Sequence, residues 1–133
     1  MRNEHFLIVD DDNTTLKTID RALTVRGFKT TLANDGREAL DIIENNTSDD
    51  EAVDIVITDI QMPEIDGLVL LAHVHENYSA MPCFVMTAYD TPDIKKRLPK
   101  DLLRFFKKPF DIKKMANAII SILEQNIPSG AIY

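Results

Sequence analysis

The sequence predicts a three-layer α/β sandwich, with one parallel sheet between two layers of helices. Apolar runs too short for helices recur along the chain, and helical segments separate them. The central run, residues 55–57, is β-branched and continuously apolar, which is typical of a strand covered on both faces. Right-handed crossovers would place the carboxyl ends of all strands at one edge of the sheet, where open α/β sheets bind ligands.

One compact domain is expected, because 133 residues with 44% hydrophobic content suffice for an ordinary core. The net charge of −7 and the pI near 4.8 disfavour direct nucleic-acid binding, which needs a basic patch. The single cysteine, Cys83, is interpreted as a buried hydrophobe in a reducing, cytoplasmic setting. No apolar run approaches about 18 residues and no signal-peptide pattern is present, so neither membrane insertion nor export is expected.

The first half of the chain alternates strand and helix. The predicted elements are a strand over residues 5–9, a helix over 14–26, a strand over 28–33 and a helix over 37–45. Asp12 or Asn13 is expected to cap the first helix, and Gly27 to end it. The apolar residues at helical spacing in that helix are Leu16, Ile19 and Leu23.

The second half continues the pattern after a polar loop over residues 45–51. The predicted elements are the central strand ending at Asp59, a helix from Gly67 to Asn77, a strand over 82–87, a short helix over 90–98, a strand over 103–107 and a helix over 111–125. The core candidates in these helices are Leu68, Leu70, Leu71, Val74, Ile112, Met115, Ile119, Ile120 and Leu123. His73 and His75 point to different sides of their helix, so they make a poor metal site.

Polar residues follow the predicted strands at the shared edge. Asp10 and Asp11 end the first strand and Asp59 ends the third. Three carboxylates in one crevice repel one another unless a cation is present. Thr87 ends the fourth strand and Lys108 follows the fifth. Phosphoryl transfer to a carboxylate needs four kinds of group: acids that bind a cation, a carboxylate nucleophile, a hydroxyl and an ammonium. For each acid taken alone, capping of a turn or helix is the simpler alternative.

The ordered motifs FLIVDDD, DGREAL, ITDIQMPEIDG, VMTA and FFKKPF resemble the receiver domain of two-component response regulators. The resemblance extends over residues 6–123. It implies a flavodoxin-like, doubly wound sheet of five parallel strands in the order 2-1-3-4-5, with helices on both faces. We expect a receiver domain over residues 4–126 and a tail or the start of a linker over 127–133. The domain is a stand-alone regulator, a relay intermediate or a receiver excised from a longer protein, and the composition of the tail favours excision.

The resemblance assigns the acidic residues one by one. Asp59 matches the phosphoacceptor, and Asp10 and Asp11 match the acidic pair that holds Mg²⁺, with Mn²⁺ as a substitute. Gln61 matches the residue whose backbone carbonyl completes the metal shell. We expect Asp11 and Asp59 to bind the metal directly and Asp10 to act through water.

The resemblance also assigns the remaining edge residues. Thr87 and Lys108 match the groups that stabilise the phosphoryl group, and Lys108 is chosen over Lys107 because it directly precedes a proline. In this family the bond between that lysine and the proline is usually cis. Thr87 and Phe105 match the switch positions.

The resemblance also implies that two positions tune the lifetime of the phosphoryl group. They lie two residues after Asp59 and two residues after Thr87, and they are Gln61 and Tyr89 in this chain. A bulky Tyr89 would shield the acyl phosphate from water, whereas Gln61 could orient a water toward it. We therefore expect a fairly long-lived phosphoryl group.

The resemblance implies a sensor histidine kinase or a phosphotransfer protein as partner. The face formed by the fourth helix, fifth strand and fifth helix is expected to change on phosphorylation and to serve an unknown output or dimerisation. The domain would catalyse only its own modification, so it is not expected to be an enzyme with a free turnover substrate.

Two other classes of protein stay open on the residues. A Mg²⁺-dependent phosphatase or phosphotransferase with an aspartyl-phosphate expects a second aspartate at the position of Gln61. A flavodoxin-like cofactor binder needs a glycine- or hydroxyl-rich phosphate loop after the first strand, where this chain has acids. Both are disfavoured.

Overall fold

Strand and helix alternate in the computed structural model, which describes residues 4–48, 50–62, 66–88, 92–98 and 102–125. The strands are β1 (His5–Val9), β2 (Lys29–Ala33), β3 (Ile55–Asp59), β4 (Cys83–Thr87) and β5 (Arg104–Lys107). The helices are α1 (Asn13–Thr24), α2 (Gly36–Asn45), α3 (Gly67–Asn77), α4 (Pro92–Arg97) and α5 (Ile112–Gln125). The predicted order of elements is confirmed.

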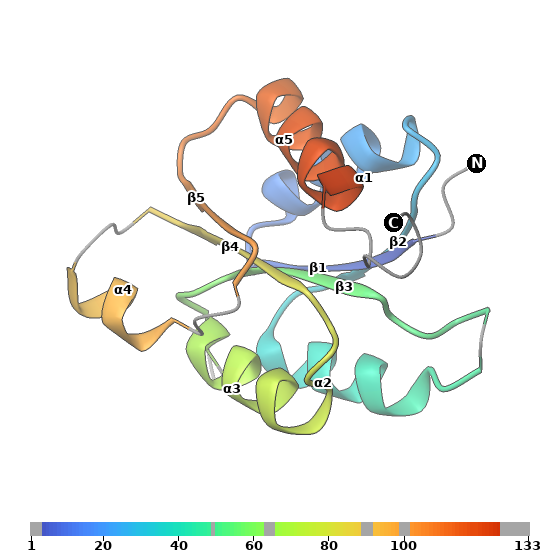
Figure 1. The fold of residues 1–133 in the computed structure, drawn as a ribbon, viewed down its shortest axis with the longest axis vertical. Coiled ribbons are helices and arrows are strands. Elements are labelled where there is room, and N and C mark those ends of the chain that lie inside the picture. The colour runs from blue at the N-terminus through green and yellow to red at the C-terminus, as the bar shows by residue number, and fades with distance from the viewer. Residues whose placement is uncertain (1–3, 49, 63–65, 89–91, 99–101, 126–133) are drawn as a thin grey trace.

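The strands form one parallel sheet in the order β2-β1-β3-β4-β5 (Figure 1). In the register of the sheet, Asp59 of β3 lies beside Met86 of β4, and Thr87 lies beside Lys107 of β5. The ends of β3, β4 and β5 therefore meet at the same edge. The predicted doubly wound topology is confirmed.

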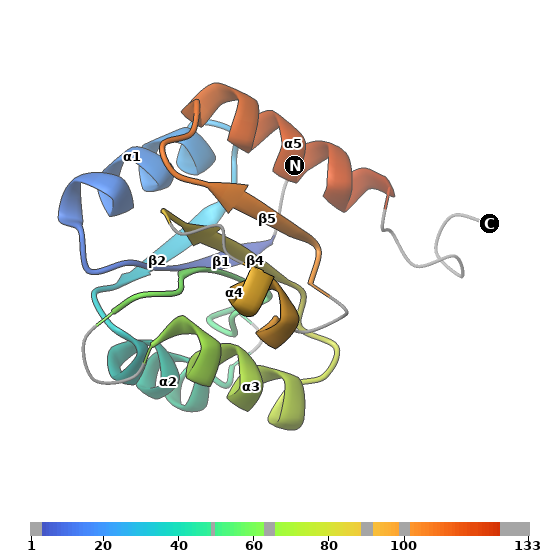
Figure 2. The same ribbon diagram turned by 90° about the vertical axis from the view of Figure 1, so that its left-hand side faces the viewer.

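Helices cover both faces of the sheet. Figures 1 and 2 show α1 and α5 on one face and α2 and α3 on the other. Alternate residues of β1 point to the two sides: Phe6 and Ile8 pack in the cluster with α1 and α5, whereas Leu7 and Val9 pack in the cluster with α2 and α3. Because helices cover both faces, β1, β3 and β4 are buried along their whole length and are mainly apolar before the polar edge.

Helix α1 ends earlier than the spacing of its apolar residues predicts. It stops at Thr24 instead of residue 26. The amide of Arg26 donates to the carbonyl of Leu23, and Gly27, with φ of 94°, donates to Thr24, so a tight turn replaces the last helical residues. Phe28 also donates to Leu23, which delays the start of β2 to Lys29.

The predicted tail over residues 127–133, with its boundary after residue 126, lies outside the described residues. So does the first part of the predicted helix over 90–98, although α4 confirms the rest of it. Within the part of the chain that is described, no helix is long and apolar enough to cross a bilayer.

Candidate functional site

Three carboxylates converge where β1 and β3 end. Suitable oxygen atoms of Asp10, Asp11 and Asp59 all lie within 4.8 Å of one another. Asp10 is fully buried, Asp59 is 7% exposed, and Asp11 is exposed to solvent. This is the acidic crevice that the sequence predicts from two strand ends.

The electrostatics of Asp59 reflect this crowding. Burial, followed by the negative charge of Asp10, raises the pKa of the Asp59 carboxyl above its usual value, and Lys108 offsets this only in part. One oxygen of Asp59 accepts a hydrogen bond from the amide of Ile60 at 2.8 Å. The carboxyl group is therefore held in place and is more basic than a solvated aspartate.

An ammonium group lies between two of the acids. Lys108 Nζ donates to Asp10 Oδ2 at 2.7 Å and to Asp59 Oδ2 at 3.3 Å. Burial lowers the pKa of Lys108, but the hydrogen bond to Asp10 and the charge of Asp59 outweigh it, so the net pKa is raised. Lys108 therefore remains a cation at neutral pH.

The backbone after β5 explains why Lys108, and not Lys107, reaches the acids. Lys107 is exposed, whereas the amide of Lys108 donates to the carbonyl of Thr87 at 2.7 Å. The bond between Lys108 and Pro109 is cis, as the resemblance implies. The hydrogen bond to Thr87 places Lys108 beside the end of β4, from where its side chain reaches Asp10 and Asp59.

Asp10 is fixed by a second contact in addition to Lys108. Its Oδ1 accepts a hydrogen bond from the amide of Asp12 at 2.9 Å. Asp12 itself caps α1, because its carboxylate accepts from the amide of Thr14 and the hydroxyl of Thr15. The prediction that Asp12 has a capping role is thus confirmed, and the cap is linked directly to the acidic crevice.

The switch candidates lie on the adjacent strands. Thr87 is fully buried at the end of β4. Phe105 lies beside Val85 in the sheet and is half-buried against the α2/α3 cluster, which also contains Ile94 of α4. Gln61 is exposed just after β3, and Tyr89 lies outside the described residues.

Gly67 is a site residue whose role the sequence did not indicate. A Cβ atom at this position would lie 2.0 Å from the carbonyl oxygen of Asp59 and 2.8 Å from Cα of Ile60. The Gly67 amide also donates to the Ile60 carbonyl at 2.6 Å. The start of α3 therefore packs directly on the backbone that carries Asp59. The only sequence signal was a glycine after an acidic turn, which does not reveal such a close approach.

The residues to which the sequence assigns no role in the site, His73, His75 and Cys83, lie away from this crevice. His73 contacts Glu44 at 3.4 Å on the α2/α3 side, and His75 is exposed. Cys83 is buried, as predicted. Among the described residues, Asp10, Asp11 and Asp59 form the one cluster of metal-ligand type.

Hard, anionic oxygen donors that crowd one another suit Mg²⁺ or Mn²⁺, so the residues present fit such an ion. Three carboxylates surround the one ammonium of Lys108, so the cluster has room for further positive charge, which supports this fit. The acidic cluster is therefore suited to a divalent cation.

Fold and site together define a class: doubly wound α/β domains with an acidic crevice at the carboxyl edge of a five-stranded sheet. A family model described as the response regulator receiver domain matches residues 6–120. The chain belongs to the response regulator receiver domain family.

Relatives from bacteria and a solved archaeal structure agree with this assignment. The chain is 34% identical over 126 residues to the transcriptional regulatory protein GlrR of Escherichia coli K12, covering 94% of this chain and 27% of the relative. It is 33% identical over 129 residues to the DNA-binding transcriptional regulator NtrC of Klebsiella pneumoniae, covering 93% and 26%. A CheY-like receiver domain from Methanospirillum hungatei JF-1 superimposes with a TM-score of 0.82 at 25% identity, covering 92% of this chain and 94% of that one. The chain thus spans about a quarter of the length of these two curated relatives.

Proposed function

We propose that Asp59 accepts a phosphoryl group from a phosphohistidine on a sensor histidine kinase or phosphotransfer protein. One observation carries this proposal: a buried, hydrogen-bonded carboxylate of raised pKa lies at a strand end, within 3.3 Å of an ammonium and beside two more acids. Structural carboxylates rarely need such surroundings, whereas a nucleophile needs both basicity and nearby positive charge.

The transfer exchanges one bond for another. The phosphorus–nitrogen bond of the donor breaks while a bond forms between phosphorus and an Asp59 carboxylate oxygen. The electron pair stays on the leaving imidazole, which takes up a proton from solvent. Lys108 remains protonated throughout and donates to the phosphoryl oxygens, and the Thr87 hydroxyl is the second donor.

The metal ion would be held by Asp11, Asp59 and the backbone carbonyl of Gln61. When bound, Mg²⁺ or Mn²⁺ supplies positive charge that offsets the carboxylates and the incoming phosphoryl oxygens. Both oxygens of Asp10 accept hydrogen bonds within the protein, from Lys108 and from the amide of Asp12. This supports a role for Asp10 through water, with the exposed Asp11 as a direct ligand.

Access for the donor is expected beside Lys108. A groove of about 330 Å³ lies between the first turns of α1 and the segment after β5. Thr14, Thr15, Thr18 and Lys108 line it together with the apolar Ala88, Pro109 and Phe110, and through Lys108 it adjoins the acidic crevice. These features support approach of a phosphohistidine from this side.

Phosphorylation is proposed to change the face formed by α4, β5 and α5. The phosphoryl oxygens are new acceptors for the Thr87 hydroxyl, and this contact exists only in the modified state. Movement of Thr87 would leave space for Phe105, which is half-buried and therefore free to become more buried. Gln61 and Tyr89 are proposed to set the lifetime of the acyl phosphate.

The output of the whole protein is a separate matter from the chemistry of this domain. The GlrR and NtrC relatives are about four times as long as the stretch that they share with this chain. We propose a cytoplasmic domain that catalyses its own phosphorylation and passes the signal to an output domain or protein.

Treatment with acetyl phosphate and Mg²⁺ tests the proposal. Intact mass should show one phosphoryl gain for the wild type and for the exposed-loop control Asp50→Asn, and none for Asp59→Asn. Asp11→Ala should lose most of the gain because it weakens the metal site. A gain that persists in Asp59→Asn would place the nucleophile elsewhere, and binding of Mg²⁺ to Asp11→Ala as tightly as to wild type would contradict the ligand assignment.

A further inference from the structure

A hydrogen bond between two asparagine side chains joins the loops that follow β1 and β2. Asn34 Nδ2 donates to Asn13 Oδ1 at 2.7 Å, across 21 positions of the chain. We call this contact the asparagine clasp. It belongs to neither helix cap, because Asp12 caps α1 and Asp35 caps α2. The clasp therefore has a role other than capping.

The clasp lies next to the loop that carries Asp11. Asn13 is the first residue of α1, two positions after Asp11. The two residues that flank Asp11 are fixed to each other, because the amide of Asp12 donates to Asp10 Oδ1 at 2.9 Å. Within the part of the chain that the structure describes, the exposed Asp11 carboxylate has no hydrogen-bond or ion-pair partner. Its position therefore depends on the backbone on either side of it.

Asn34 is anchored on its own side of the clasp. Its backbone amide donates to Glu38 Oε1 at 3.2 Å, and the amide of Glu38 donates to Asp35 Oδ1 at 2.8 Å. This reciprocal arrangement fixes Asn34 to the start of α2. The β2 side of the clasp is therefore a firm support from which the α1 side can be restrained.

Pairing of the two strands does not need the clasp. β1 and β2 are in register up to Val9 and Ala33, and the amide of Asp10 then donates to the carbonyl of Ala33 at 3.1 Å. The clasp lies beyond this last backbone bond. It therefore restrains residues 11–13, which the sheet itself no longer holds.

We propose that Asn34 is a positioning residue for the metal site, and that through Asn13 it holds the loop of Asp11 in the arrangement that binds Mg²⁺. Mg²⁺ demands near-ideal octahedral geometry at about 2.0–2.1 Å, so a small displacement of one ligand weakens binding. A loop that is already ordered also loses less conformational entropy when the ion binds. The inference rests on the proposed function in one respect, that Asp11 is a direct ligand of the ion.

Calorimetric titration of the full chain with MgCl₂ tests the proposal. Asn34→Ala and Asn13→Ala should each raise the dissociation constant about three- to fivefold, which is the effect of losing one ordinary hydrogen bond. The double variant Asn13→Ala/Asn34→Ala should match either single variant, because the same contact is lost. Independent effects would instead multiply to about ninefold or more.

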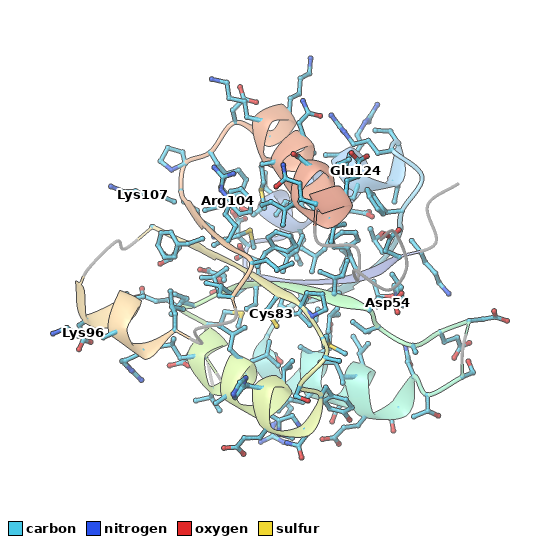
Figure 3. The ribbon with its side chains drawn as sticks, in the orientation of Figure 1. Asp54, Cys83, Lys96, Arg104, Lys107 and Glu124 are labelled. Carbon is cyan, nitrogen blue, oxygen red and sulfur yellow. The ribbon has the colours of Figure 1, made fainter. Side chains whose placement is uncertain are left out.

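Two controls separate positioning from a general loss of stability. Asn77→Ala removes an exposed asparagine that donates within α3 at 3.0 Å. Asp54→Ala removes a carboxylate that accepts from the backbone of β1 at 2.8 Å. Figure 3 shows Asp54 on the opposite side of the molecule from Lys107, which ends β5 on the side of the crevice. At about 0.15 M salt, which screens the removed charge, both controls should change Mg²⁺ affinity less than about twofold.

Hydrogen exchange in EDTA gives a readout without metal. The amide of Asp12, which donates to Asp10, reports whether the loop is ordered. NMR should show at least about threefold faster exchange of this amide in Asn34→Ala, and no change in Asn77→Ala. Phosphorylation of Asn34→Ala by acetyl phosphate should be slower at limiting Mg²⁺. At saturating Mg²⁺ its rate should come within about twofold of wild type, because a weakened metal site is then filled.

Several outcomes would overturn the inference. Equal weakening of Mg²⁺ binding in Asn34→Ala and Asp54→Ala would show a general loss of stability. Multiplying effects in the double variant would show that the two asparagines act separately. Unchanged affinity and unchanged exchange in Asn34→Ala would show that the clasp does not order the loop. All three leave Mg²⁺ binding and phosphorylation of the wild type intact, whereas absence of both in the wild type would contradict the proposed function itself and this inference with it.

Discussion

Lys108 Nζ lies 2.7 Å from Asp10 Oδ2, joining two residues that are 98 positions apart in the chain. Asp10 is fully buried, and its other carboxylate oxygen, Oδ1, accepts a hydrogen bond from the amide of Asp12. The ammonium therefore serves two purposes: it satisfies a buried carboxylate and it holds positive charge next to Asp59.

Replacement of Lys108 by Met should destabilise the domain. The variant keeps a similar length but leaves the buried Asp10 carboxylate without its charged donor, at a cost of about 2 kcal/mol. Urea unfolding at neutral pH in EDTA measures this change. The matched control is Lys107→Met at the exposed neighbour, which should change stability by less than about 0.5 kcal/mol. Similar losses in both variants would show that the pair with Asp10 contributes nothing specific.

Replacement of Asp59 by Asn should stabilise the metal-free protein at neutral pH. The pKa of Asp59 is raised on folding, mainly by burial, so the folded state keeps the proton longer than the unfolded state. Stability therefore falls as pH rises from the ordinary value of 3.8 through the folded pKa, and the cost is fully present at pH values above both.

Urea unfolding in EDTA across pH tests the sign of this effect. The advantage of Asp59→Asn over wild type should be largest near neutral pH and shrink as pH falls toward 3.8. An advantage that grows on acidification would mean that Asp59 is stabilised, not destabilised, as an anion in the folded domain.

Replacement of Gly67 by Ala should disturb the strand end that carries Asp59. The new methyl group would meet the Asp59 carbonyl at 2.0 Å, and backbone cannot move aside cheaply, so we expect a loss of about 1–3 kcal/mol and slower phosphorylation by acetyl phosphate. Gly27→Ala is the control, because strain at φ of 94° should cost about 1 kcal/mol far from the crevice. Normal phosphorylation in Gly67→Ala would show that this contact does not position Asp59.

The fold was predictable because its signals are local. The apolar runs, the cap at Asp12 and the turn at Gly27 each act over a few residues, and together they specify the alternation of strands and helices. The clustering of acids at the sheet edge was predictable from the topology, because neighbouring parallel strands bring Asp10 and Asp59 together.

Contacts between distant residues were not predictable in the same way. Buried His5 donates through Nδ1 to the carbonyl of Ala52 at 3.1 Å, and its Nε2 lies 2.6 Å from the hydroxyl of Thr31. Neither partner is close in sequence, so the residues alone placed His5 in a strand without indicating its contacts. The choice of Lys108 over Lys107 likewise needed the family resemblance, because strand alternation could not decide it.

A phosphoryl mimic should move the switch residues. In structures determined with and without beryllofluoride and Mg²⁺, the Thr87 hydroxyl should approach Asp59, and Phe105 should turn inward. Further burial of Phe105 would contribute about 1–3 kcal/mol. That is enough to change the equilibrium constant between the two states of this surface by a factor of about 10 to 100. The same Phe105 rotamer in both structures would make it a permanent core residue and leave Thr87 as the only switch.

The location of the acyl phosphate tests the central claim most directly. After treatment with acetyl phosphate and Mg²⁺, borohydride reduction converts a phosphoaspartate to homoserine, and peptide mass spectrometry then locates it in the wild-type chain. The account predicts homoserine at position 59 and unmodified aspartates at positions 10 and 11. Homoserine at Asp10 or Asp11, or at none of the three, would contradict it.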